Sequence, residues 1–247
     1  MTDIEKNIDI VYEDNHLIVI NKRTGIIVQE DATGDKPLVE MVRDYIREKY
    51  KKPGNVFTGL VHRIDRPVSG LVIFSKTSKG LERMTELFKN KEIKKIYWAV
   101  VKNLPAEPVG KLCHWLLKDR ENNIVTLFNE QVSLASYAEL SYRVIYSFSP
   151  YYLMEVNLVT GKPHQIRAQL ASIGCPIRGD KKYGFSSANR DKSINLHAKR
   201  IEFIHPVKKT SIVVEAPLPD TDFWRQLKEF EQLQSANQHE IMKEITT

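Results

Sequence analysis

The chain has 247 residues, of which 42% are hydrophobic, and its 37 Lys and Arg stand against 31 Asp and Glu. This content can bury a core without disulfides or a structural metal, and no apolar run reaches the about 20 residues that span a bilayer. The first residues hold no apolar stretch of the signal-peptide type, and only two cysteines occur. We therefore expect a reduced, cytoplasmic protein without a membrane partner, whose net charge of +6 permits a polyanionic partner.

Strands dominate the predicted secondary structure. In chain order they are expected at residues 8–12, 17–20, 71–74, 93–101, 124–128, 138–146, 152–158, 194–204 and 211–214. Four helices are expected: one opening at Pro37, one capped by Thr77, one opening at Pro163 and stopped by Gly174, and one running from Asp220 through Phe230. Because runs of strands follow one another directly, we expect an α+β fold with a mixed, largely antiparallel β-sheet and flanking helices.

Several common catalytic motifs are absent from the sequence. It contains no GxxxxGK[ST], GxGxxG, HExxH or GxSxG pattern, so nucleoside triphosphate hydrolysis, dinucleotide redox chemistry and zinc peptidase chemistry lack support. Cys113 and Cys175 form no CxxC pair, and the seven histidines show no close pairing on one helix face. The sequence therefore predicts no metal site.

The densest polar cluster is residues 62–70, which read HRIDRPVSG and lie between two apolar segments. Asp65 stands between Arg63 and Arg66, and nearby guanidinium groups favour the ionised form of a carboxylate. An ionised, partly desolvated carboxylate suits a nucleophile or a base. The alternative is a structural salt bridge that pins a loop, since such ion pairs also perturb carboxylates.

Two further segments carry polar groups on a predicted helix and a predicted strand. In residues 160–170, TGKPHQIRAQL, Arg167 lies one turn after His164 and off the apolar face. Arg167 either pairs with a carboxylate from another segment or binds phosphate, and a solvated helix face is the alternative. Tyr97, on the strand at 93–101, is either a core aromatic residue or a ring that stacks on a nucleobase.

Four segments of the sequence resemble the RluA-type pseudouridine synthases and occur in that family's order. They are HRIDRPVSGLVIFSK, KKIYWAVV, VTGKPHQIRAQLASIGCPIRGDKKYG and INLHAKRIEF, and the resemblance covers roughly residues 9–218. It implies the pseudouridine synthase catalytic fold and an isomerase that converts selected uridines in RNA to pseudouridine, with no cofactor. Together with the last predicted helix, which runs through Phe230, the resemblance implies a catalytic domain at residues 8–230, followed by a C-terminal tail at 231–247 that is expected to fray.

The resemblance implies a catalytic set of Asp65, Tyr97 and Arg167. By position, Asp65 matches the family's catalytic aspartate, which attacks C1′ of the nucleotide or abstracts the C2′ proton. Arg167 matches the arginine that pairs with this aspartate. Tyr97 matches the active-site tyrosine, which stacks on the base or assists loss of the C5 proton.

The resemblance also implies residues that bind the substrate. Arg63 matches the arginine that enters the RNA stack where the target base leaves, and Leu196 looks like part of the apolar floor beside the uracil. The neighbouring motif residues His62, Arg66 and His164 are expected to bind substrate as well. Phosphates are expected to be neutralised by scattered basic residues, namely Lys94, Lys95, Arg178, Lys181, Lys182, Lys199 and Arg200.

Many members of the family carry a small N-terminal RNA-binding domain. Here the catalytic-type sequence begins by about Ile8, so RNA selection is expected to come from the catalytic domain or from another partner. The expected partner is rRNA or tRNA, and we expect a monomer. Two other functions stay open: a catalytically inactive RNA-binding protein of the same fold, and a carboxylate-dependent nucleoside or glycosyl hydrolase, which shares attack at C1′.

Overall fold

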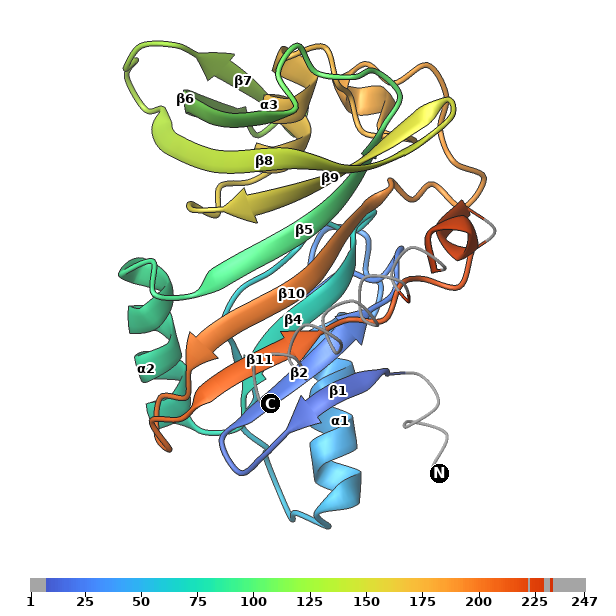
Figure 1. Cartoon of the computed structure of the whole chain (residues 1–247). Helices are drawn as coiled ribbons and strands as arrows, with labels where there is room; N and C mark the ends of the chain where they lie inside the picture. Colours follow the sequence, from blue (N-terminus) through green and yellow to red (C-terminus); the bar gives the residue numbers. More distant parts are fainter. Residues whose placement is uncertain (1–7, 222, 229–231, 233–247) are drawn as a thin grey trace, which may run out of the picture. The chain divides into compact units, whose positions relative to one another are not determined.

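The computed structural model describes residues 8–221, 223–228 and 232, and it divides into two compact units, residues 1–216 and 217–247. All strands of the described residues belong to the first unit (Figure 1). In the second unit, residues 223–228 are helical, and Asp220 accepts hydrogen bonds from the side chains of Arg225 and Lys228. Phe230 and the predicted boundary of the tail lie outside the described residues, so the division at residue 230 stays a prediction.

The first unit combines a large sheet with a few helices. Its strands are β1 (Ile10–Glu13), β2 (Leu17–Lys22), β3 (Gly59–Leu60), β4 (Ser69–Ser75), β5 (Lys94–Val101), β6 (Val109–Asp119), β7 (Ile124–Phe128), β8 (Ser136–Phe148), β9 (Tyr151–Leu158), β10 (Leu196–Ile204) and β11 (Ser211–Glu215). Its helices are α1 (Leu38–Lys49), α2 (Ser78–Lys89) and α3 (Gln165–Ser172), with a 3₁₀ turn, η1, at Lys181–Tyr183.

One sheet runs through the whole unit in the order β1-β2-β4-β10-β5-β9-β8-β6-β7, with β3 on β4 and β11 on β10 (Figure 1). Every strand pair of the described residues is antiparallel except β4 with β10, where Ser69 lies opposite His197 and Gly70 opposite Ala198. The predicted α+β fold with a mixed, largely antiparallel sheet is confirmed. The late strand β10 lies between β4 and β5, which precede it by about a hundred residues.

Alternating apolar side chains give the sheet two buried faces. Along β2, Ile18 and Ile20 belong to one core cluster, which α1 and α3 cover, whereas Leu17 and Val19 belong to a second cluster on the α2 side. Burial on both faces explains why these strands read as continuous apolar runs. The face covered by α1 and α3 also holds Tyr97.

Local signals in the sequence set the first two helices. Pro37, at which the sequence predicts the helix to open, is the extended N-cap residue of α1, so the helix begins one residue later, at Leu38. The hydroxyl of Thr77 accepts a hydrogen bond from the amide of Gly80 at 3.1 Å, so the predicted cap of α2 is confirmed.

The sequence interpretation was wrong for two elements. Helix α3 begins at Gln165 rather than at Pro163, because His164 takes the left-handed conformation (φ 51°) and turns the chain just before the helix. Strand β6 was not predicted. Its side chains alternate between exposed and half-buried, with only Leu116 buried, so it lacks the apolar run that marks the other long strands.

No helix of the described residues is long and apolar enough to cross a membrane.

Candidate active site

The loop that carries Asp65 is fixed by backbone hydrogen bonds to two distant segments. The carbonyl of Arg66 accepts from the amide of Gly25 at 2.9 Å, and that of Pro67 accepts from the amide of Ile194 at 3.1 Å. The loop then enters β4 at Ser69. The φ of the next residue, Gly70, is 108°, and a Cβ there would collide with the backbone of Ala198. The loop therefore has one tightly determined path between β3 and the centre of the sheet.

A single arginine from α3 joins Asp65 to a second, buried carboxylate. Nη1 of Arg167 donates to Oδ2 of Asp65 at 2.9 Å. Its Nε and Nη2 donate to the two oxygens of Asp180 at 2.7 and 2.9 Å, a bidentate pair of the kind that fixes a guanidinium plane. Burial disfavours the charge of Arg167, but the hydrogen bonds to Asp180 and the charge of Asp65 raise its pKa above the usual value. Arg167 thus stays cationic and presents one fixed donor to Asp65.

The side chain of Asp65 remains accessible, with an exposed fraction of 28%, whereas those of Arg167 and Asp180 are 7% and 1% exposed. The alternative interpretation, a solvated helix face, is wrong, because residues 165–170 of α3 are all buried. The arrangement is a carboxylate at a surface, held from beneath by a buried cation.

His164 lies beside Asp65 and contacts Tyr183. Nδ1 of His164 lies 2.8 Å from the hydroxyl of Tyr183, and its Nε2 lies 3.8 Å from Oδ2 of Asp65. Burial lowers the pKa of His164 to about 4, although the charge of Asp65 opposes this effect. The imidazole is therefore neutral at pH 7. The Tyr183 ring also packs against the guanidinium of Arg167, 5.1 Å away.

Tyr97 and Leu196 come from neighbouring strands at the centre of the sheet. In the β5–β10 pair, Leu196 lies opposite Ala99, and Tyr97 opposite Ala198. Both side chains belong to the core cluster on the α1 face, with exposed fractions of 7% and 3%. Burial raises the pKa of Tyr97 above its usual value, and the charge of Asp65 adds to this effect. The phenol is therefore protonated at neutral pH and lies within electrostatic reach of Asp65.

The other three sequence candidates differ in their surroundings. Arg63 is exposed. Arg66 donates to Asp35 at 2.6 Å, and the guanidinium that donates to Asp65 is that of Arg167. Nε2 of His62 accepts from the backbone amide of Ile73 at 3.1 Å, its ring stacks on Phe88, and burial lowers its pKa to about 3.

Sequence reasoning missed Lys22, which lies under the Asp65 loop. Its side chain is 1% exposed, and Nζ donates to the carbonyls of Arg23, Ile26 and Arg66 at 2.9 to 3.2 Å. Burial lowers the pKa of Lys22 to about 7, against the opposing charge of Asp65. A lysine that ends an apolar strand was the available signal. Asp180 and Tyr183 were also missed, although both lie within the third quoted segment.

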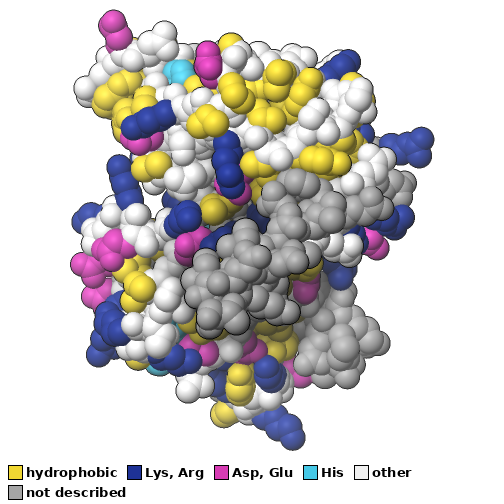
Figure 2. Space-filling model, viewed as in Figure 1, with side chains coloured by type: hydrophobic (Ala, Val, Ile, Leu, Met, Phe, Trp, Pro, Cys, Tyr) yellow, Lys and Arg dark blue, Asp and Glu magenta, His cyan; other side chains and the backbone are white. Residues whose placement is uncertain are grey.

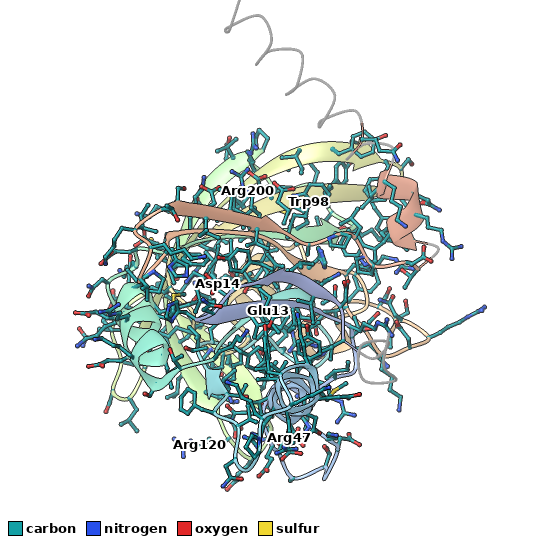
Figure 3. All side chains as sticks on the ribbon, turned by 90° about the horizontal axis from the view of Figure 1, so that it is seen from below. Glu13, Asp14, Arg47, Trp98, Arg120 and Arg200 are labelled. Atoms are coloured by element: carbon teal, nitrogen blue, oxygen red, sulfur yellow. The ribbon has the colours of Figure 1, made fainter. Side chains whose placement is uncertain are left out.

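Several basic residues expected to contact phosphates have internal partners. Lys95 and Lys199 are buried, and Nζ of Lys199 donates to the carbonyl of Ala216 at 3.0 Å. Arg178 donates to Asn189 and Asn195, both at 2.8 Å. Arg200 pairs with Glu202 at 2.6 Å, and Figure 3 places it on the opposite side of the sheet from Arg47 of α1.

Among the described residues, no three His, Cys, Asp or Glu side chains group to hold a metal ion.

Comparisons with known proteins agree with this fold. The family model described as RNA pseudouridylate synthase matches residues 16–172. The ribosomal large subunit pseudouridine synthase C of Buchnera aphidicola is 35% identical over 223 residues, covering 87% of this chain and 68% of the relative. The tRNA pseudouridine synthase C of Vibrio cholerae is 29% identical, covering 86% and 92%.

The chain spans only 65% of another relative, the ribosomal large subunit pseudouridine synthase C of Vibrio cholerae, to which it is 30% identical. Among solved structures, human RNA pseudouridylate synthase domain containing 4 superposes with a TM-score of 0.72 at 21% identity, covering 86% of this chain and 89% of that one. This likeness shows the shared fold. The chain belongs to the RNA pseudouridylate synthase family, a family of isomerases.

Proposed function

We propose that this protein isomerises selected uridines in rRNA or tRNA to pseudouridine, with Asp65 as the reacting carboxylate. The observation that carries the proposal is the fixed donor that buried Arg167 gives to one oxygen of the accessible Asp65. Similarity to one relative named for ribosomal RNA and one named for tRNA supports these two substrate classes. We further propose that the protein acts in the cytoplasm as a monomer, without metal.

The proposed reaction places three demands on the site. The C1′–N1 bond breaks, the uracil rotates, C5 bonds to C1′, and the proton that C5 loses to water is replaced by a proton that N1 takes up from water. Atoms and electrons balance without an oxidant or a reductant, so the chain's own side chains can supply the chemistry. The site must hold a detached base, offer a carboxylate at the sugar and keep that carboxylate charged.

Asp65 suits the second and third demands. Oδ2 is held by Arg167, and among the described residues Oδ1 accepts no hydrogen bond, so Oδ1 faces the substrate in our proposal. Asp65 then attacks C1′ or removes the C2′ proton. Arg167 orients the carboxylate and stabilises its charge in either case.

The first demand is met by removing the nucleotide from its stack, which costs a few kcal/mol. In our proposal, exposed Arg63 fills the space that the target base leaves. The ring of Tyr97 and the side chain of Leu196 then contact the uracil. The buried, protonated phenol of Tyr97 contributes contact area and a hydrogen-bond donor. His62, Arg66 and His164 act at the margin of this pocket.

The test is tritium release from RNA labelled at C5 of uridine, because isomerisation displaces this hydrogen. Wild type, Asp65→Asn and Asp35→Asn are compared on unmodified rRNA and on tRNA. The exposed Asp35, which pairs with Arg66, provides a matched loss of one carboxylate charge nearby. We expect release by wild type and Asp35→Asn and none by Asp65→Asn.

Other outcomes identify the alternatives. Free uracil in the products would indicate a hydrolase. RNA binding without release on both substrates would indicate an inactive RNA-binding protein.

A further inference from the structure

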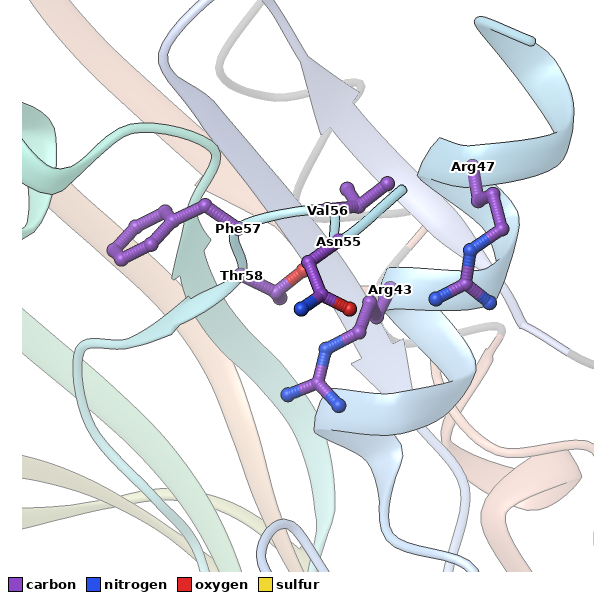
Figure 4. Close-up of a pocket in the computed structure, with 6 residues that line it drawn as sticks. All are labelled: Arg43, Arg47, Asn55, Val56, Phe57 and Thr58. Carbon is purple, nitrogen blue, oxygen red and sulfur yellow. The ribbon is translucent and has the colours of Figure 1, made fainter. Parts of the chain in front are cut away.

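We propose that a pocket between α1 and residues 55–58 binds the RNA backbone at a distance from the reacting uridine. The inference rests on the proposed function, because it extends the RNA surface around Asp65. The pocket encloses about 480 Å³ and is lined by Arg43, Arg47, Asn55, Val56, Phe57 and Thr58 (Figure 4). Nothing in the proposed isomerisation step uses these residues.

The charge of the pocket suits a phosphate group. Arg43 and Arg47 lie one turn apart on α1 and extend toward residues 55–58, and the lining contains no Asp or Glu (Figure 4). Arg47 pairs with Asp44 of its own helix at 2.7 Å. Arg43 makes no ion pair or hydrogen bond within the part of the chain that the structure describes. The pocket therefore carries a guanidinium whose charge nothing in the described structure neutralises.

A buried hydroxyl gives a second, independent indication of a ligand. Oγ1 of Thr58 is buried but has no hydrogen-bond partner among the described residues. Buried polar groups in native proteins are nearly always paired, so an orphaned hydroxyl in a pocket lining points to a missing partner. A phosphate oxygen accepts a hydrogen bond from this hydroxyl, and the exposed amide of Asn55 can add another.

The ring of Phe57 makes nucleic acid a better occupant than a free anion. Its side chain is 44% exposed and points away from α1 (Figure 4). An exposed aromatic ring on the segment that lines the pocket provides a stacking surface for a base of the same RNA strand, and proteins hold single-stranded RNA by combining such rings with basic groups. We therefore assign the pocket to a nucleotide of the RNA substrate.

The pocket lies on the same face of the sheet as the proposed active site. Val56 belongs to the core cluster that also contains Ile64 and Tyr97. Thr58 precedes Asp65 by seven residues, a span of at most about 25 Å. The pocket therefore lies close enough to Asp65 for one RNA strand to contact both. The opposite face, seen in Figure 2, scatters Lys and Arg among Asp and Glu over its described part.

The experiment measures RNA binding as a function of salt for wild type, Arg43→Ala and Arg143→Ala. Arg143 is a matched control, since it is exposed, pairs with Glu155 and alternates with the core residue Tyr142, which directs it to the opposite face. We expect Arg43→Ala to raise Kd about five- to tenfold and to reduce the salt slope by about 1, with kcat at saturating RNA unchanged. Arg143→Ala should leave both quantities at the wild-type values.

Two further comparisons separate direct contact from a change in folding. Thr58→Val keeps the shape and removes the hydroxyl; it should also raise Kd, while urea unfolding shows unchanged or higher stability. On RNA trimmed to the target nucleotide and one neighbour on each side, Arg43→Ala and wild type should bind equally. Equal binding of Arg43→Ala and wild type on the long RNA overturns the proposal. The binding readout does not depend on turnover, so loss of tritium release in wild type would count against the proposed function alone.

Discussion

Arg167 connects chemistry and stability at the residue scale, because the same guanidinium holds accessible Asp65 and buried Asp180. Lysine at this position would keep the charge but lose the planar fork that binds Asp180 through two donors. We expect Arg167→Lys to lower kcat at least about 100-fold, the size of effect expected when a reacting group is displaced by about 1 Å. Tritium release under saturating RNA measures this change. Arg143→Lys, on the exposed pair with Glu155, should keep wild-type kcat.

Stability should respond differently to loss of the Arg167 side chain and to loss of the Asp65 charge. Arg167→Ala leaves the carboxylate of Asp180 buried without its cation, which costs about 3–5 kcal/mol of unfolding free energy. Asp65→Asn keeps a polar group at an accessible position and should cost less than about 1 kcal/mol. Urea denaturation at pH 7 compares the two variants. Equal losses would mean that the Asp180 pair does not organise this region.

His164 predicts a pH dependence of stability. The unfolded chain takes up a proton near pH 6.5, whereas the folded protein keeps the buried ring neutral down to about pH 4. Acidification through this window therefore favours the unfolded state, by about 2 kcal/mol between pH 7 and pH 5. His164→Gln, which can still bond Tyr183, should lose correspondingly less stability over this range. Parallel urea titrations at the two pH values test the difference, and identical losses would contradict it.

At the scale of elements, Gly70 shows how closely β4 and β10 approach. Its φ of 108° and the backbone of Ala198 leave no room for a Cβ, so Gly70→Ala should lower the unfolding free energy by more than about 3 kcal/mol. Gly174→Ala is the matched control, because its φ is 75° and no atom lies within 4 Å of the added carbon. Its cost should be limited to backbone strain, about 1 kcal/mol. Thermal unfolding of the two variants separates crowding from strain.

Elements with strong local patterns could be predicted from the sequence. The apolar runs that became β4 and β5 and the cap at Thr77 are examples, since burial on two faces and a side-chain cap are local properties. Strand β6 could not, because it is mostly half-buried and its place depends on pairing with β7 and β8.

The site was predictable in part. The polar motifs around Asp65 and Arg167 were visible, but the resemblance, rather than residue chemistry, suggested their pairing across 102 positions. The roles of Asp180 and Lys22 in the site depend on their burial. No spacing rule reveals that a charged residue is buried. Charged side chains are ordinarily assigned to the surface, whereas both of these residues are buried.

At the scale of the whole molecule, β10 makes the centre of the sheet depend on the end of the first unit. A chain ending at residue 193 lacks β10 and β11, and leaves the edges of both β4 and β5 unpaired. We expect this truncated chain to show no cooperative urea transition and to aggregate, whereas the full chain unfolds cooperatively. Circular dichroism and light scattering report the two outcomes; a cooperative transition in the truncated chain would show that β10 is dispensable for folding.

The insertion of β10 has a consequence for the protein during its synthesis. Ser69 and the His197 ring it contacts are 128 residues apart, so at 5–20 residues per second a ribosome takes roughly 6–26 s to supply the second after the first. During this interval Asp65 has been synthesised, but Ile194, whose amide donates to the carbonyl of Pro67 in the Asp65 loop, has not. Incomplete products of translation would thus carry the carboxylate that we propose to react without the framework that directs it, so the proposed RNA modification would have to await synthesis of β10.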